Sequence, residues 1–66
     1  MNLTINGSVK EVKDGLTIQG LLKELEIEPG RVAVEVNVNI IKKVHYQEYQ
    51  LKDGDSVEIV NFVGGG

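Results

Sequence analysis

The sequence lacks cysteine altogether and contains a single histidine, His45, among its 66 residues. A disulfide framework is therefore excluded, and a zinc site built from cysteine and histidine has too few ligands. These are the usual supplements for a domain this small, which buries only about 60% of the surface that its unfolded chain exposes. The fold must depend on aliphatic side chains, and 41% of the residues are hydrophobic.

Positive charge and long apolar runs are also scarce. The formal net charge is -3, so the field of the whole chain repels nucleic-acid phosphates and anionic membrane surfaces. No apolar run approaches the roughly 20 residues that span a bilayer, and the N-terminus lacks the basic and apolar segments of an export signal. We therefore expect no nucleic-acid partner, no membrane association and a cytoplasmic location.

The first third of the chain predicts a hairpin followed by a helix. Residues 1–6 alternate between apolar and polar, and Asn6-Gly7 tolerates the positive φ angles of a type I′ turn. A return strand over residues 8–13 carries two valines that break the alternation, Val9 and Val12, which indicates a bulge or a frayed edge. An apolar stripe with helical spacing then follows, made of Ile18, Leu21, Leu22 and Leu25.

The sequence also indicates where that helix begins and ends and which residue in it is unfavourable. Thr17 is placed to cap its first turn through the side-chain oxygen. Gly20 lies inside the helix at a cost of roughly 1 kcal/mol relative to alanine, and we expect it to allow a close approach of helix to sheet. Glu28-Pro29-Gly30 ends the pattern, because proline cannot continue the helical hydrogen bonds.

Three more strands are predicted after the helix. One has a face of alternating valines, Val32, Val34 and Val36, and Ile40-Ile41 follows a short polar break as the next. Residues 42–50 have no clear period and are interpreted as a surface connection with a helical turn.

The chain then returns to the core at Leu51 and turns at Asp53-Gly54-Asp55 before a final strand over residues 56–63. The resulting order is β-β-α-β-β-β. It predicts an α+β domain in which one mixed sheet wraps over one α-helix.

Few residues could form a conventional active site. His45 stands alone on the predicted connection, where a histidine is usually solvated. Asp53 and Asp55 lack the longer series of ligands of a calcium-binding loop, so a tight turn is the better interpretation. No set of acid, base and nucleophile is visible, and we expect neither an enzyme nor a metal site.

The unusual feature is the C-terminal run of Gly64, Gly65 and Gly66. Glycine has no Cβ, so such a run predicts a thin, flexible thread that enters a channel too narrow for side chains. Three extended residues reach roughly 10 Å, and the carboxylate of Gly66 is ionised at neutral pH and can attack an activated phosphate. Taken alone, this composition favours a disordered tail without a function.

Just before the tail, the predicted final strand is apolar on both faces. Val57 and Ile59 share one face, whereas Val60 and Phe62 lie on the other. Val60 and Phe62 form either an exposed patch that docks a partner or a pair that a loop covers or a bulge turns inward. The sequence leaves both interpretations open.

Together, the length, the order of elements and the terminal glycines resemble the ThiS family of β-grasp, ubiquitin-like sulfur carriers. The residues that carry this resemblance are Asn6-Gly7, Thr17, Leu21-Leu22, Val32-Ala33-Val34-Glu35, Asn37, Leu51, Asp53-Gly54-Asp55, Glu58-Ile59-Val60 and Phe62 to Gly66. The chain departs from the family pattern at Gly20, Val38, Lys43 and Tyr46. The resemblance implies a β-grasp domain over residues 1–63 and a flexible glycine tail over residues 64–66.

The resemblance also implies a sulfur carrier of thiamine (thiazole) biosynthesis that is not itself an enzyme and binds no cofactor. A ThiF-like adenylyltransferase would use ATP and magnesium to adenylate Gly66, and sulfur from a donor protein would convert it to a thiocarboxylate. A ThiG-like thiazole synthase would take that sulfur, with Gly64, Gly65, Phe62 and Val60 contacting the partners. The alternatives are a carrier for molybdopterin or cysteine synthesis and a ubiquitin-like protein modifier.

Overall fold

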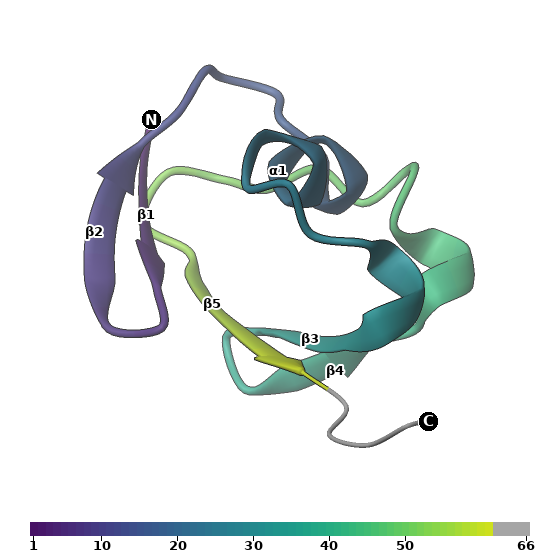
Figure 1. Cartoon of the computed structure of the whole chain (residues 1–66). Helices are drawn as coiled ribbons and strands as arrows, with labels where there is room; N and C mark the ends of the chain where they lie inside the picture. Colours follow the sequence, from purple (N-terminus) through teal and green to yellow (C-terminus); the bar gives the residue numbers. More distant parts are fainter. Residues whose placement is uncertain (62–66) are drawn as a thin grey trace.

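In the computed structural model, a mixed sheet wraps over one α-helix (Figure 1). The structure describes residues 1–61. Along this part of the chain the elements are β1 (Asn2–Ile5), β2 (Ser8–Glu11), α1 (Ile18–Glu24), β3 (Val32–Val36), β4 (Asn39–Ile41) and β5 (Ser56–Asn61), with 3-10 turns at Pro29–Arg31 and Lys43–His45. This is the order that the sequence predicts.

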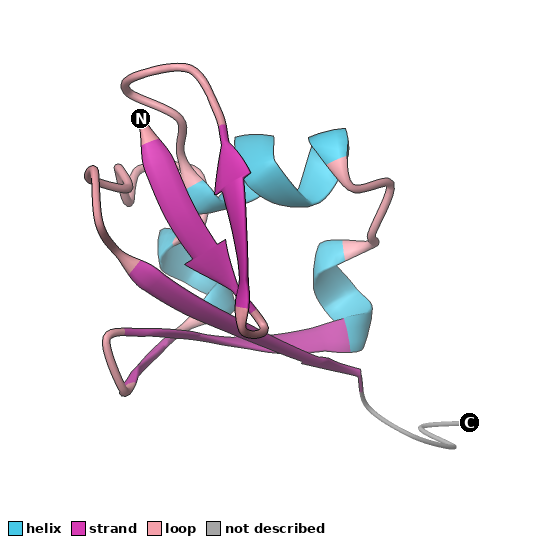
Figure 2. Ribbon diagram, turned by 90° about the vertical axis from the view of Figure 1, so that its left-hand side faces the viewer, coloured by secondary structure: helices cyan, strands magenta, loops and turns pink. Residues whose placement is uncertain are grey.

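The sheet has the strand order β2-β1-β5-β3-β4, so the last strand lies in its middle. β5 runs parallel to β1 and antiparallel to β3, whereas β1 with β2 and β3 with β4 form antiparallel hairpins. α1 lies on the concave side of the curved sheet in both views (Figures 1 and 2). β5 pairs with β3 as far as Asn61, which lies opposite Val32 and is the last residue that the structure describes.

The core fills the space between α1 and the concave face of the sheet. The side chains with the least exposure are Leu3, Ile18, Leu21, Leu22, Val34, Val36 and Val57. Three of them belong to the predicted apolar stripe of the helix, and Leu25, the fourth member of that stripe, forms the C-cap and packs against the core. The predicted helix and the valine face of β3 are therefore confirmed.

The beginning of α1 is capped by a side chain and by a distant loop. Thr17 accepts a hydrogen bond from the Gly20 N–H at 3.1 Å, as its position predicts. The Ile18 N–H donates to the Tyr49 carbonyl at 3.1 Å and the Gln19 N–H donates to the Tyr46 carbonyl at 3.0 Å. The loop between β4 and β5 therefore supplies acceptors for helical N–H groups that have none within the helix.

That loop is less superficial than the sequence suggests. The 3-10 turn at Lys43–His45 is exposed, as predicted, but Tyr46 is only 2% exposed and belongs to the core. The prediction of a surface connection is therefore wrong for this residue. A lone buried aromatic residue in a non-periodic segment leaves no pattern, because its burial depends on packing against α1 and β3.

One local expectation needs correction, and one open alternative is decided. The nearest atoms to a Cβ built on Gly20 belong to Leu16, whose Cδ1 would lie at 2.8 Å, and to Thr17, so the close approach is to the segment before the helix and not to the sheet. Of the two alternatives for the return strand, the bulge is absent: the pairing of β1 with β2 is regular, and β2 ends at Glu11. Val9 lies opposite Thr4 and is 73% exposed, whereas Val12 lies just past β2 and is buried.

Candidate functional site

The residues predicted to meet partners lie at and beyond the end of β5. Val60 is on that strand and is 52% exposed. Phe62, Gly64, Gly65 and Gly66 lie outside the described residues, and their roles stay predictions. The site that can be built from the structure is therefore the sheet face around Val60 and the contacts that hold β5 in place.

The convex face of the sheet carries a mixed apolar and acidic surface. Because Val34, Val36 and Val57 point into the core, the residues between them on β3 and β5 point away from α1. The register places Val60 opposite Ala33 and Glu58 opposite Glu35, and Ile40 of β4 also lies opposite Glu35. We call Ala33, Glu35, Ile40, Glu58 and Val60 the outer-face patch. Its two largest aliphatic side chains are well exposed, Val60 at 52% and Ile40 at 72%.

Asn6 fastens the far half of β5 to the first hairpin. Its carboxamide oxygen accepts from the Ile59 N–H at 2.8 Å, and its amide nitrogen donates to the Ile59 carbonyl at 3.2 Å. Its backbone N–H donates to the Val57 carbonyl at 2.9 Å. The side chain thus extends the pairing between β1 and β5 to Ile59, the residue directly before Val60.

Asn37 does the same at the near end of β5. Its carboxamide oxygen accepts from the Ser56 N–H at 3.0 Å, and its amide nitrogen donates to Asp55 at 2.9 Å. The Asn37 N–H donates to the Ser56 carbonyl at 2.8 Å. One turn asparagine from each hairpin therefore holds the central strand that leads to the predicted tail.

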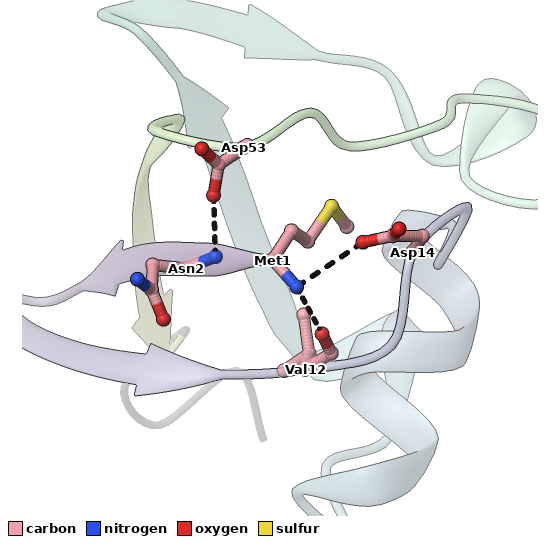
Figure 3. Close-up of polar contacts among 5 residues, drawn as sticks. All are labelled: Met1, Asn2, Val12, Asp14 and Asp53. Carbon is pink, nitrogen blue, oxygen red and sulfur yellow. Dashed lines mark hydrogen bonds and ion pairs between the residues drawn. The ribbon is translucent and has the colours of Figure 1, made fainter.

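The turn before β5 uses its two aspartates as hydrogen-bond acceptors. Asp55 accepts from the Lys52 N–H at 2.8 Å, and Asp53 accepts from the Asn2 N–H at 2.7 Å (Figure 3). Figure 3 also shows the Met1 amino group, which donates to the Val12 carbonyl at 2.6 Å and to Asp14 at 3.2 Å. The aspartates satisfy backbone donors at the end of the sheet, in agreement with a tight turn.

His45 is solvated and apart from the patch. Its Nδ1 lies 3.2 Å from a Glu48 carboxylate oxygen, and both side chains are exposed. Within residues 1–61, no three side chains of the metal-ligating types gather into a site. In the same part of the chain, no helix has the length and apolar character needed to cross a bilayer.

Sequence reasoning missed the second role of the two asparagines. The sequence predicts Asn6 as a turn residue, and its φ of 49° with 87° at Gly7 agrees with the type I′ turn. Asn37 lies in a comparable turn, with a φ of 50° followed by 64° at Val38. A signal was present in the residue type, because asparagine tolerates positive φ and also offers both a donor and an acceptor.

Comparison with known proteins finds relatives of this chain in one family. The ThiS family model matches residues 3–66. The chain is 51% identical to the sulfur carrier protein ThiS of Bacillus subtilis over 65 residues, which cover 97% of this chain and 98% of that protein. The crystal structure of the thiamine biosynthesis protein (ThiS) from Geobacter metallireducens superposes with a TM-score of 0.87 at 36% identity, over 100% of both chains.

Two other relatives are longer and are named thiazole synthase. The chain is 42% identical to the one from Paramagnetospirillum magneticum and 36% identical to the one from Magnetococcus marinus. In both cases the whole chain is matched but spans only 20% of the relative. The predicted β-grasp fold is confirmed by the Geobacter structure. On the match over residues 3–66 and the similarity along its whole length, the chain belongs to the ThiS family.

Proposed function

We propose that this chain is a sulfur carrier protein of thiamine (thiazole) biosynthesis and that it carries sulfur on the carboxylate of Gly66. The observation that carries the proposal is the family match, which runs through all three terminal glycines. Full-length similarity to a protein named sulfur carrier supports it. The absence of cysteine from the sequence leaves no thiol that could hold sulfur as a persulfide.

The chemistry has two steps. A carboxylate oxygen of Gly66 attacks the α-phosphorus of ATP in a ThiF-like adenylyltransferase, and pyrophosphate leaves. Sulfur from a donor protein, at the oxidation level of sulfide, then attacks the acyl carbon as HS⁻. AMP leaves with the oxygen that joined it to the glycine, and the remaining S–H proton is released. A carboxylate is a poor acyl donor, so adenylation supplies the leaving group that the second step requires. One oxygen is exchanged for one sulfur.

The folded body contributes position and not catalysis. β5 is held by strands on both sides and by two asparagine side chains, so the point from which residues 62–66 extend is fixed. Five extended residues reach roughly 17 Å from that point. A carrier of this kind presents a surface to each partner and a thin terminus to its active site.

A ThiG-like thiazole synthase is the proposed acceptor of the sulfur. The support comes from the two relatives named thiazole synthase, in which a segment similar to this whole chain is part of the same polypeptide. In a separate protein, the equivalent encounter requires a docking surface.

The proposal is tested by intact-mass measurement. The chain is incubated with ATP, magnesium, a sulfide source and the ThiF-like adenylyltransferase of its own host. The expected result is a gain of about 16 Da on a chain that ends at Gly66, because sulfur replaces one oxygen of an activated carboxylate. A variant that ends at Val63 serves as the control and should gain nothing while keeping its circular-dichroism spectrum. A wild-type chain of unchanged mass would contradict the proposal.

Product identity separates the alternatives. The charged carrier is mixed with a thiazole synthase and its substrates, and formation of the thiazole phosphate is followed. A thiocarboxylate that forms but is consumed only in molybdopterin or cysteine synthesis would reassign the pathway. An amide bond to a lysine of another protein would instead indicate a protein modifier.

A further inference from the structure

The outer-face patch contains a pair of like charges that the fold itself does not need. Glu35 and Glu58 lie directly opposite each other on the antiparallel strands β3 and β5. Opposed residues on one face bring their Cβ atoms to about 4.5–5.5 Å, where like charges destabilise a sheet. Both side chains point away from the core, because their neighbours Val34, Val36 and Val57 are fully buried.

No cation within the described residues forms an ion pair with either glutamate. The ion pairs formed by residues 1–61 join Met1 with Asp14, Arg31 with Glu28, and His45 with Glu48. Lys42 follows directly after β4, next to the patch in the chain, yet it forms no ion pair with Glu35. The two carboxylates are therefore available to a charge from outside.

Apolar side chains surround the two carboxylates. Val60 follows Glu58 on the same face of β5, Ala33 lies opposite Val60, and Ile40 lies opposite Glu35. Val60 and Ile40 are 52% and 72% exposed. Apolar groups around a charge exclude water when a partner covers them, which strengthens a charged contact at the centre.

We propose that Glu35 and Glu58 together bind a cationic side chain, an arginine in particular, on the surface of a thiazole synthase, while Val60, Ala33 and Ile40 pack against apolar residues around it. A guanidinium has five N–H donors in a planar fork and can bridge two neighbouring carboxylates. This inference rests on the proposed function, because a carrier must dock with the enzyme that removes its sulfur. Thiazole synthase is the chosen partner because two relatives contain a segment like this chain within such an enzyme.

The position of the patch suits that role. Val60 lies next to Asn61, the last residue of β5, so a partner seated on this face lies beside the point where residues 62–66 begin. Five extended residues reach roughly 17 Å. The terminal glycine can therefore enter an active site of the same partner while the partner stays bound to the sheet face. Docking and delivery then take place on one protein surface.

The proposal predicts that removal of both carboxylates raises the stability of the fold and lowers the affinity for the partner. Replacing both carboxylates in Glu35→Gln with Glu58→Gln removes the repulsion, so the midpoint of thermal unfolding should rise by roughly 1 to 5 °C. The same double variant should bind the thiazole synthase of the host at least about tenfold more weakly, because the partner's cation loses its counter-charge. If the pair had only a structural role, the double variant would not gain thermal stability while it lost affinity for the partner.

A single charge reversal sharpens the test. Glu35→Lys places a lysine opposite Glu58, which creates an attractive cross-strand pair and should also stabilise the fold. The lysine neutralises Glu58 and takes the place of the partner's cation, so binding should fall about as far as in the glutamine double variant. The matched control is Glu24→Gln with Glu48→Gln, which changes the net charge equally at exposed sites outside the patch and should bind within about twofold of wild type.

Binding is measured by calorimetry with the purified 66-residue chain and the host thiazole synthase. Unchanged affinity in the patch double variant, an equal loss in the control, or no binding by the wild-type chain would each overturn the inference. Mass gain with the adenylyltransferase is recorded for the same samples. A wild-type chain that gains about 16 Da in these conditions keeps the carrier proposal intact even if docking does not depend on the patch.

Discussion

Val57 and Val60 belong to the same strand, β5, but lie in different environments. Val57 is 0% exposed and Val60 is 52% exposed, although the residue type is the same and only two residues separate them. The first lies opposite Val36 in the core, and the second lies opposite Ala33 on the convex face. The period of two along a strand therefore separates the side chains that stabilise the domain from those that are free to meet another protein.

The strongest test of this separation is a matched pair of truncations. Val57→Ala removes two buried methyl groups and leaves a cavity, so the free energy of unfolding should fall by roughly 2 kcal/mol. Val60→Ala should change it by less than about 0.5 kcal/mol but should weaken the binding of a thiazole synthase. Urea denaturation and calorimetry give the two quantities. Equal losses of stability would show that both faces of β5 are structural.

The separation also requires that β5 stays in register, which Asn6 helps to ensure. Asn6→Gly keeps the positive φ of the turn but removes both side-chain hydrogen bonds to Ile59, and it should cost about 1 to 2 kcal/mol. Asn6→Asp retains an acceptor for the Ile59 N–H and loses only the donor. Its free energy of unfolding should therefore lie between those of wild type and Asn6→Gly. Urea denaturation measures both variants. A glycine variant as stable as wild type would mean that backbone pairing alone fixes the strand.

A smaller effect is expected at the two hairpin turns, which differ at one position. Gly7 and Val38 each follow an asparagine and both have positive φ, but valine is β-branched and strained in this region. Val38 is also 90% exposed, so its side chain gains nothing from the core. Val38→Gly should raise the free energy of unfolding by about 0.5 to 1 kcal/mol, the relieved strain less the added backbone entropy.

Binding adds a second measurement to that variant. If Val38→Gly leaves the affinity for thiazole synthase unchanged, the docking surface ends at Ile40. A loss of affinity would extend it to the turn and give the strained valine a function. A drop in stability would show that the turn does not relax when glycine replaces valine.

The weakest effect is a pH dependence on the concave side. Burial raises the pKa of Tyr46 above its ordinary value of 10.0, and a hydrogen bond with the backbone of Val34 opposes that rise. The unfolded chain then loses this proton at a lower pH than the folded one. The free energy of unfolding is therefore undiminished below pH 10 and falls as the pH rises above it. Tyr46→Phe should remove part of this fall, which urea denaturation at pH values on either side of 10 would measure.

Much of the fold could be predicted from the sequence because its signals are local. The valines of β3 alternate, the helix has a stripe and a threonine cap, and Asn6-Gly7 fits only a few turn types. The central position of β5 could not be predicted, because strand order depends on pairing between distant segments. The same holds for Tyr46, whose ring is buried by elements far from it in the sequence.

The candidate site was predicted less completely. The apolar run at the end of β5 indicated Val60, but its exposure was open because alternation alone does not say what covers a face. The sequence does not indicate that Glu35 and Glu58 lie opposite each other, because this follows only from the pairing of β3 with β5. The role of Gly66 stays a prediction that rests on the composition of the tail and on the family match.

The central place of β5 has a consequence for biosynthesis. A ribosome makes this strand after all the others, and the two hairpins have no common sheet until it lies between them. Folding must therefore wait for a late, long-range pairing, of the kind that makes small domains fold slowly. A nascent chain that stops before residue 56 lacks the strand that joins the hairpins, so interrupted synthesis should give unfolded fragments that proteases remove, and not a folded decoy that occupies the partner enzymes.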